Sequence, residues 1–502
     1  MNYSSMPHTT AMRASLASMS QWMPSRLRQP EFLMFSAVAV VLGGFTVAAL
    51  SSRHAALLIL AGLAPFVAIV IGQLRKLLLA IIILDIPLGI DIHLGFRSEM
   101  AGLGALGGYN LSVSLICLAL LYALWLGEFV CRKGPRVSPR LRESLPLILY
   151  VAALLISTLI ATDAALSAFQ VFLYLQMLLL FVYVASTVRT REDVLFIGAT
   201  LVLGLIIESL VMIYVRGTGQ HIALGPISTA VEESFIGSGR MGGTLGSPNT
   251  AAGYLVMLTL FTSSFLFTRL RAFYKLVAAC AFGVGSVALL ITGSRGGWAS
   301  FVISLLVLWF LAWRGGWLSL QSSFAVVIVT VLLSAVFHEA ILNRLVSDDH
   351  GAAYSRVPLM RLAFEMIKEH PILGVGPNNF AAVMDSYMTA DIRKAWMYTV
   401  HNKYLLIWSE TGFFGMAAFL WFLAATLRAA WHCSYSRDPL IGPLAFGLTA
   451  ALLAHDAHML VDVFNDRPMV QLLCFVGALV VAIYAMQRQG ARRYHESRVR
   501  FI

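Results

Sequence analysis

The sequence predicts an all-α, polytopic integral membrane protein with about 14 transmembrane helices. Of its 502 residues, 59% are hydrophobic and only 12% are charged. An ordinary soluble domain is about half apolar and a quarter charged, so this chain has too little charge to cover three or four soluble domains. The composition therefore excludes soluble globular, disordered and disulfide-scaffold proteins.

Long apolar runs mark the expected spans, because each helical crossing needs roughly 20 apolar residues. The third run is short and is interrupted by Pro87. The runs lie near 31–50, 55–73, 77–92, 110–131, 145–162, 169–187, 194–215, 250–268, 274–292, 297–313, 318–337, 403–427, 439–461 and 469–487. The ends, 1–30 and 488–502, remain as tails, and 1–30 lacks the apolar core of a secretory signal.

The distribution of Lys and Arg predicts the orientation of the chain. The set of alternate loops that includes both tails holds 23 basic residues, against 6 on the other side when the long loop 338–402 is left out. Since cytoplasmic loops carry the excess of Lys and Arg, we expect both termini in the cytoplasm. The same bias explains most of the net charge of +11, so nucleic acid is not an expected partner.

We divide the membrane part of the chain into N-terminal transmembrane helices, 31–215, and a C-terminal transmembrane region, 216–487. Two outer loops of the second part, 216–249 and 338–402, are too long to be simple connections. Long structured loops are where a scaffold usually carries its function. Functional residues are therefore expected in these two loops.

The first long loop holds Arg240 in a Gly-rich segment and ends at Asn249, where a span begins. Glycines let the backbone approach a ligand, a helix start attracts anions, and Asn249 is expected to cap the following helix. The alternative interpretation is a plain Gly/Pro turn between two spans.

Arg295 lies in the sequence Gly-Ser-Arg-Gly-Gly between two other spans. An arginine at membrane depth needs a partner or a water-filled cavity, and its fork of donors matches phosphate oxygens. The alternative is a side chain that extends to lipid headgroups.

The second long loop contains a predicted amphipathic helix, 354–369, that we expect to lie on the outer membrane surface. Arg356 lies near its start, and Arg361 and Glu365 form an i,i+4 pair. His370-Pro371 ends the helix before a tight Gly-rich turn. The positions that follow one helical face are Met360, Ala363, Phe364 and Ile367.

His401 closes the second long loop at the mouth of the next span, beside several arginines. A histidine in that place can act as a general base near neutral pH, and the alternative is an interfacial histidine that forms a local cap. In the span near 439–461, His458 and Asp462 stand at i,i+4, which predicts one shared helix face. Ionisable groups inside a span are functional candidates; the alternative is a polar cluster in which Asp462 orients His458.

Other polar residues of the spans give no further site. His455 and His458 lack a clear third ligand, so no metal is expected. Glu208 and Asp85 are lone acids in apolar surroundings, and we expect them to be structural hydrogen-bond anchors.

The order of these elements resembles the bacterial O-antigen ligase and polymerase superfamily, whose members are multi-span membrane glycosyltransferases. The resemblance covers about residues 240–470. Its elements are specific in order and spacing rather than singly. They are Gly-Ser-Arg-Gly-Gly at 293–297, Arg356, His-Pro-Ile-Leu-Gly-Val-Gly at 370–376, His401-Asn402-Lys-Tyr-Leu, Glu-Thr-Gly-Phe-Phe-Gly at 410–415, and His458 followed by Asp462.

The resemblance implies a metal-independent, cofactor-free, inverting enzyme of the bacterial inner membrane with its active site at the periplasmic face. The donor would be a glycan on undecaprenyl diphosphate, and the acceptor a hydroxyl of a glycan or of lipid A-core. Arg295, Arg356 and His401 match the family's catalytic arginines and histidine by position. The expected substrate-binding residues are Arg240, Asn249, Arg361, Asn402, His458 and Asp462.

Three transferases and one transporter remain as functional hypotheses. The first is a polymerase of exopolysaccharide or O-antigen repeat units, for which a chain-length regulator is an expected partner. The second is a ligase that transfers finished glycan to lipid A-core, and the third transfers glycan to a protein. A transporter would place ionisable residues along a pathway at mid-membrane, whereas the arginines here gather in outer loops.

Overall fold

The computed structural model describes residues 74–130, 137–224, 227–229, 239–318, 356–388 and 397–499, with eight single residues between 321 and 338. The chain forms two units, Met1–Leu79 and Ala80–Ile502, and the description below concerns the second. The predicted spans near 31–50 and 55–73, most of the span near 318–337, and the tail 1–30 lie outside the described residues.

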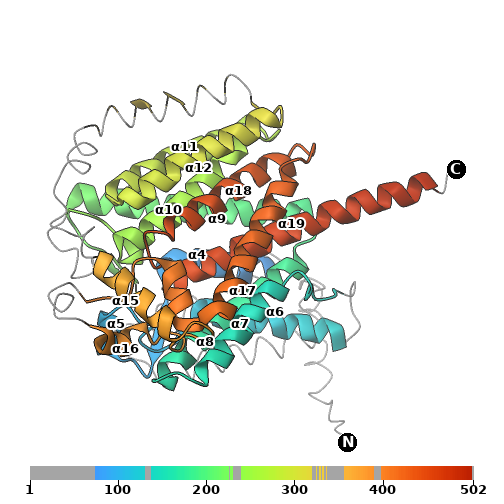
Figure 1. Ribbon diagram of the computed structural model, residues 1–502. Helices are drawn as coiled ribbons and strands as arrows, with labels where there is room; N and C mark the ends of the chain where they lie inside the picture. The colour runs from blue at the N-terminus through green and yellow to red at the C-terminus, as the bar shows by residue number, and fades with distance from the viewer. Residues whose placement is uncertain are drawn as a thin grey trace, which may run out of the picture. The chain divides into compact units, whose positions relative to one another are not determined.

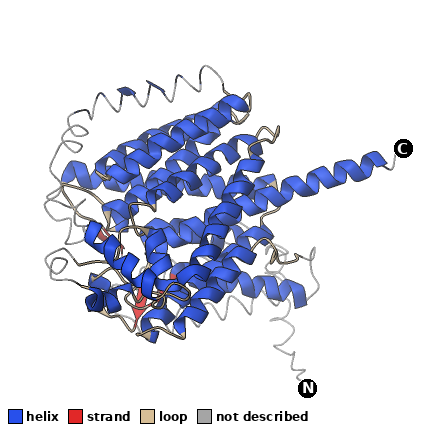
Figure 2. Cartoon of the chain, in the orientation of Figure 1, coloured by secondary structure: helices blue, strands red, loops and turns tan. Residues whose placement is uncertain are grey.

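Figures 1 and 2 show that helices dominate the described chain and that strands occur only as short pairs. The longer helices are α4 (Leu74–Leu88), α6 (Val113–Val130), α7 (Leu145–Thr158), α8 (Ala164–Thr187), α9 (Arg191–Thr218), α10 (Pro248–Ser263), α11 (Ala272–Ile291), α12 (Arg295–Arg314), α15 (Arg356–Glu369), α17 (Lys403–Cys433), α18 (Ile441–His458) and α19 (Arg467–Val499). The shorter elements are α5 (Ser98–Gly102), α16 (Phe380–Val383), η3 (Gly243–Leu245), η4 (Ser264–Phe267), η5 (Met384–Tyr387), β1 (Asp91–Leu94), β2 (Tyr109–Ser112), β3 (Ala223–Leu224) and β4 (Ile227–Ser228).

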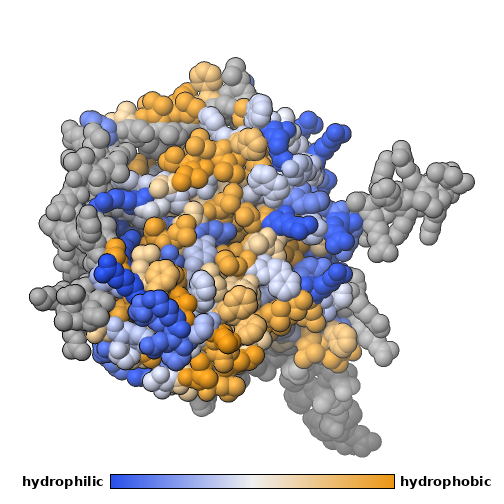
Figure 3. Space-filling view, in the orientation of Figure 1, coloured by the Kyte–Doolittle hydropathy of each residue, from blue (hydrophilic) through white to orange (hydrophobic). Residues whose placement is uncertain are grey.

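Eight of the described helices are long and apolar enough to cross a membrane: α6, α8, α9, α10 with η4, α11, α12, α17 and α19. α7 is apolar but shorter. On the face shown in Figure 3, hydrophobic side chains run across the middle of the helices and hydrophilic ones gather toward both ends. The predicted polytopic all-α membrane fold is therefore confirmed, while the number of 14 spans stays a prediction.

The core forms around α10, which is buried along its whole length. α10 packs against α11, α12 and α18, while α17 packs against α7 and α19 against α8. Polar caps set where several helices begin. Asp163 caps α8, Thr190 and Asp193 form a capping box on α9, and Ser294 caps α12, since each side chain satisfies amides that a helix start leaves unpaired.

α15 confirms the predicted helix in the second long loop but corrects its apolar face. Phe364 is exposed, and Glu365 pairs with Lys368 rather than with Arg361. The buried face packs against protein, including Phe380 and Leu406, so it is not a face laid on the membrane. Periodicity shows that such a face exists but not what covers it. The fully buried positions are Leu359, Leu362, Ala363 and Met366.

The Gly-rich turn after α15 fits into a break in α17. Gly412 has φ 63° and ψ −162°, which is not helical, and this opens backbone groups of α17 for outside partners. Val375 N donates to Ser409 O at 2.9 Å, and Phe413 N donates to Pro371 O at 2.9 Å. The turn 370–376 thereby holds the bend of α17, which positions the first half of that helix.

We expect Gly412→Ala to destabilise the protein. Its backbone conformation is essentially restricted to glycine, and an added Cβ would lie 2.2 Å from Ile372 O. The expected cost is of order 1–3 kcal/mol, visible as a lower melting temperature of the purified protein in detergent. Gly283→Ala on α11 is the matched control, because no atom lies within 4 Å of its added Cβ; equal melting temperatures for the two variants would contradict the role of the bend.

Candidate active site

Helix ends from distant parts of the chain meet at one end of the fold, the end where α10, α12, α17 and α19 begin and α18 ends. We call it the site end. A Cβ on Gly296 of α12 would lie 2.7 Å from the Val461 side chain and 3.1 Å from His458 Cδ2, so the start of α12 lies directly on the end of α18. In Figure 1, α15 and α16 gather at the same end.

The turn between α18 and α19, residues 459–466, receives the start of α17. Lys403 N donates to Met459 O at 2.9 Å and to Asp462 O at 3.2 Å. Asn402 Nδ2 donates to Leu460 O at 3.0 Å, while Asn402 Oδ1 accepts from Leu405 N and caps α17. The structure therefore gives Asn402, an expected substrate-binding residue, two structural bonds that fix the mouth of α17 against the α18–α19 turn.

Arg356 is tied to the same turn from the other side. Its Nη1 donates to Val461 O at 3.0 Å, and its charge lies within electrostatic range of the rings of both His401 and His458. Asp462 also acts on both rings. One arginine, one carboxylate and two histidines, from three separate segments, therefore converge beside the turn.

His401 is half-buried and is oriented by its own segment. Its Nδ1 lies 3.2 Å from Thr399 O, and because a carbonyl only accepts, this nitrogen donates in the neutral ring and leaves the basic lone pair on Nε2. Burial lowers the pKa of His401 below its ordinary value of 6.5; Asp462 opposes this and Arg356 adds to it. The ring is therefore kept neutral at physiological pH, as a general base must be.

The segment that carries His401 is anchored by the N-terminal half of the chain. Thr399 N donates to Leu103 O at 2.9 Å, just after α5. Asn378 fixes the neighbouring loop by accepting from Leu106 N at 2.7 Å and donating to Leu106 O at 2.9 Å. Residues near 103–106, which carry no functional signal in the sequence, thus hold the histidine in place.

Arg240 and Asn249 join the first long loop to the turn before α12. Arg240 Nη2 donates to Asn249 Oδ1 at 2.6 Å, and its Nε donates to Thr292 O at 3.0 Å. The expectation that Asn249 caps α10 is wrong, because the N-cap position is Ser247 and Asn249 is inside the helix. Asn249 instead holds Arg240 beside the segment that leads to Arg295, the first residue of α12.

His458 and Asp462 are close together, but not on one helix face as predicted. α18 ends at His458, and Asp462 lies in the turn beyond it. The His458 ring packs at a steep angle to Phe464, with ring centroids 4.8 Å apart, and the ring also lies close to Gly296 and Gly297. A helical i,i+4 spacing fails here because the helix stops before the second residue.

Arg361 is separated from the other candidates. It is exposed on α15, five residues after Arg356, which at 100° per residue places the two side chains on different faces of the helix. The structure thus brings together Arg356, His401, Asn402, His458 and Asp462 at the turn. It joins Arg240 and Asn249 to the segment just before Arg295, and it leaves Arg361 exposed on another face of α15.

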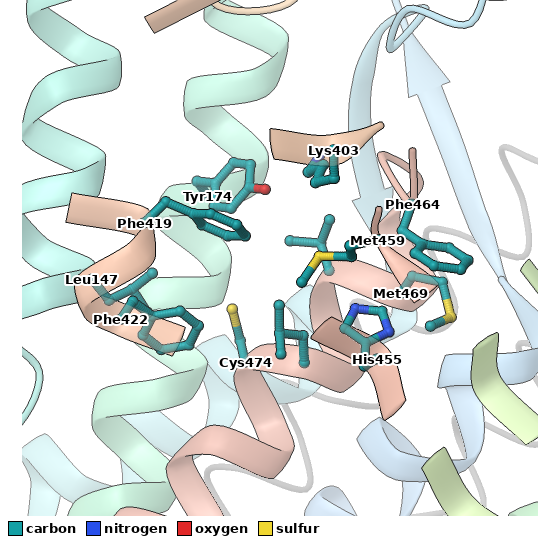
Figure 4. Close-up of a pocket in the computed structure, with 12 residues that line it drawn as sticks. Leu147, Tyr174, Lys403, Phe419, Phe422, His455, Met459, Phe464, Met469 and Cys474 are labelled. Carbon is teal, nitrogen blue, oxygen red and sulfur yellow. The ribbon is translucent and has the colours of Figure 1, made fainter. Parts of the chain in front are cut away.

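Lys403 and Asn465 belong to the site end, although neither was a candidate from the sequence. Lys403 is only 2% exposed, and its Nζ donates to Asn465 Oδ1 at 2.8 Å. Behind it, Lys403 and His455 line a small, mostly apolar cavity, shown in Figure 4, with room for about one water molecule. A lysine at the edge of an apolar run is usually solvent-exposed, so nothing in the sequence indicated that Lys403 is buried in the site.

Two acids of the membrane helices differ in how they meet expectation. Glu208 is a structural anchor as expected, because it accepts from Thr244 N at 2.9 Å. Asp85 is an anchor too, because it accepts from Ser114 N at 3.1 Å. It is not a lone acid, however: Arg467 Nη1 donates to it at 3.0 Å, and Arg467 Nε donates to Asp91 at 2.9 Å. In the described ranges, no three His, Cys, Asp or Glu side chains cluster as metal ligands would.

Residues 280–420 match the family model described as O-antigen ligase. Residues 280–420 are therefore a domain similar to the O-antigen ligase family. This confirms the resemblance to the superfamily and supports a membrane glycosyltransferase activity of the O-antigen ligase or polymerase type. No curated protein matches the chain at a significant level.

The O-antigen ligase domain includes Arg295, Arg356 and His401 but not the whole site end. Arg240 lies before it, and the α18–α19 turn lies after it. The hydrogen bonds of Arg356 to Val461 and of Asn402 to Leu460 therefore leave the matched region. The site is assembled by the O-antigen ligase domain together with the segments on either side of it.

Proposed function

We propose that this protein transfers a glycan from undecaprenyl diphosphate to an acceptor hydroxyl at the periplasmic face of the inner membrane, and that it polymerises repeat units of an exopolysaccharide or O-antigen. The observation that carries the proposal is the convergence of Arg356, His401 and Asp462 with the start of α12, which carries Arg295. A transporter reading predicts no such convergence at a helix end.

The arginines serve the leaving group. As the bond between the sugar C1 and the diphosphate oxygen breaks, negative charge grows on undecaprenyl diphosphate. Arg295 and Arg356 supply fixed positive charge and planar pairs of N–H donors for it. The starts of α10 and α12 add the positive ends of two helix dipoles.

His401 serves the acceptor. Its Nε2 takes the proton of the acceptor hydroxyl while the oxygen bonds to the sugar C1 from the side opposite the diphosphate. One bond forms and one breaks, the proton stays on the imidazole until solvent removes it, and the configuration at C1 is inverted. Asp462 stabilises the imidazolium that forms, since its negative charge acts on the ring.

The proposal predicts the pH dependence of transfer. A base must be neutral to work, so kcat/KM rises with pH through the pKa of His401 and reaches its plateau above it. Because burial depresses that pKa, the acid limb is expected below pH 6.5. Asp462→Asn removes the carboxylate that raises the pKa, so its acid limb moves to still lower pH. An acid limb that stays in place in this variant contradicts the pairing of Asp462 with His401.

The test of function is a deletion strain in which lipid-linked glycan and surface polysaccharide are both analysed. Single repeat units on the lipid, with no polymer, support the polymerase. Long polymer stranded on the lipid beside bare lipid A-core supports the ligase alternative, and loss of glycan from a protein alone supports protein transfer. If neither lipid-linked glycan nor surface polysaccharide changes, every transferase hypothesis is contradicted and the transporter hypothesis is favoured.

Two further parts of the proposal concern the orientation of the protein in the membrane and a partner protein. Both termini are proposed to be cytoplasmic, which places the site end outside, as the basic residues of the loops support. A polymerase is also proposed to work with a chain-length regulator. The second point is tested in a separate strain that keeps this protein but lacks the regulator's gene. The measurement there is the distribution of polymer lengths.

A further inference from the structure

The hairpin formed by β1 and β2 is inverted, with its apolar face outward. The strands pair antiparallel with Ile92 opposite Leu111 and Leu94 opposite Tyr109. Side chains opposite each other lie on one face of a sheet, so these four form a single apolar face. All four are exposed, at 55%, 37%, 51% and 36% in the order named. A hairpin in water normally shows the opposite arrangement.

Most of the polar face of the same hairpin is turned inward, while His93 on that face is exposed. Asn110 and Ser112 are buried, and Asn110 Nδ2 donates to Asp91 Oδ2 at 2.7 Å. Asp91 in turn accepts from the buried Arg467 of α19, and Asn110 O accepts from Gln176 of α8 at 3.1 Å. The inverted orientation is therefore fixed by a buried ion pair and hydrogen bonds.

The apolar face continues onto the exposed surface of a membrane helix. β2 runs directly into α6 without a connecting residue, and on α6 Ile116 and Leu120 are exposed large apolar residues. α6 is a candidate span of which only 22% is buried inside the protein. The face of the hairpin and the lipid-facing side of α6 are thus neighbouring parts of one apolar surface.

We propose that the outer face of this hairpin, the residues Ile92, Leu94, Tyr109 and Leu111, is a membrane-binding surface that lies against lipid at the headgroup–acyl boundary. A two-stranded hairpin leaves unpaired N–H and C=O groups along its outer edges, and these are not tolerated in the hydrocarbon core. Water and headgroups at the boundary satisfy them, and an aromatic side chain such as Tyr109 is favoured there.

The proposed contact bears on catalysis through one connection, and this part rests on the proposed function. The segment between the two strands contains Leu103, whose carbonyl accepts from Thr399 N, two residues before His401. A hairpin held at the lipid boundary therefore fixes the depth of the histidine relative to the membrane surface, where the diphosphate of a lipid-linked donor lies.

The test uses site-specific photo-crosslinking of the full chain in its native membrane. Benzoylphenylalanine is placed at Leu94 or Leu111, and the adducts are identified by mass spectrometry. We expect phospholipid adducts at both positions. Ile303, exposed on α12, serves as the lipid-facing control, and Glu99, exposed on α5, serves as the water-facing control.

Adducts of Leu94 and Leu111 with residues 1–73 of this chain, or with another protein, would overturn the proposal, and so would a yield no higher than that of Glu99. This readout needs no transferase activity, so it can fail while the proposed function stands. The link to catalysis is tested by the double variant Leu94→Asp, Leu111→Asp, which leaves Thr399 and His401 unmutated. We expect glycan transfer to be reduced in this variant. Normal transfer in this variant would remove the depth argument but leave the crosslinks.

Discussion

Arg356→Ala is expected to abolish glycan transfer while the protein still inserts into the membrane. The side chain donates one hydrogen bond to Val461 O and is not buried in the core, so its loss leaves packing intact. Removing a preorganised donor from a developing anion costs about 100- to 1,000-fold in rate, and Arg356 contributes a full charge as well. The measurement is complementation of the deletion strain by the variant, with polymer analysed on gels and membrane content followed by immunoblot.

Lys368→Ala is the matched control for Arg356→Ala. It removes a cation from the same helix, where Lys368 is exposed and pairs with Glu365 across one helical turn. An exposed pair of this kind contributes little to stability, and we expect normal polymer. Normal polymer from Arg356→Ala as well would contradict the whole mechanism.

Arg295→Lys has the second largest expected effect, a loss of roughly 100-fold or more in transfer. Lysine keeps the charge but offers a compact ammonium in place of a planar fork, so paired contacts to two phosphate oxygens are lost. The same complementation assay measures the result, and the donor concentration dependence shows whether kcat falls more than binding. We expect both to suffer, because the arginine is proposed to hold the diphosphate before and during bond cleavage.

The control for Arg295→Lys is Arg271→Lys, a like exchange at an exposed position just before α11. It is expected to leave transfer unchanged. Full activity of Arg295→Lys would instead reduce Arg295 to a side chain that extends to lipid headgroups, and the leaving-group charge would then have to rest on Arg356 and Arg240.

The helices of the described chain were predictable because membrane spans are recorded in local composition. Lengths of apolar sequence set α8, α9 and α11 to within a few residues of the expected runs. The start of α17 at Lys403 was predicted from the end of the long loop. Local composition does not show where a helix gives way to another element within an apolar run. The helix expected near 77–92 ends at Leu88, and the chain then enters the inverted hairpin.

The site was predictable in its members more than in its architecture. Arg356 and His401 stand out because polar groups beside apolar spans are rare, and they are indeed brought together. Lys403 and Asn465 were missed because their partnership joins residues 62 apart in sequence, and Arg467 was missed because its partners lie 376 and 382 residues away. A single sequence carries no signal for such pairings, whereas i,i+4 spacing misled for His458 and Asp462 by assuming a helix that had already ended.

The carbonyls of Leu460 and Val461, which hold Asn402 and Arg356, lie beyond the domain at 280–420. That domain is therefore not a portable module. A chimera that received only residues 280–420 from a relative would gain the relative's arginines and histidine. It would lack the relative's α18–α19 turn, which positions them, and the carbonyl at the position of Leu103, which anchors the loop that carries the histidine. An exchange of specificity between relatives therefore has to transfer three parts together: the matched domain, the turn as far as Asn465, and the segment between β1 and β2 that contains Leu103.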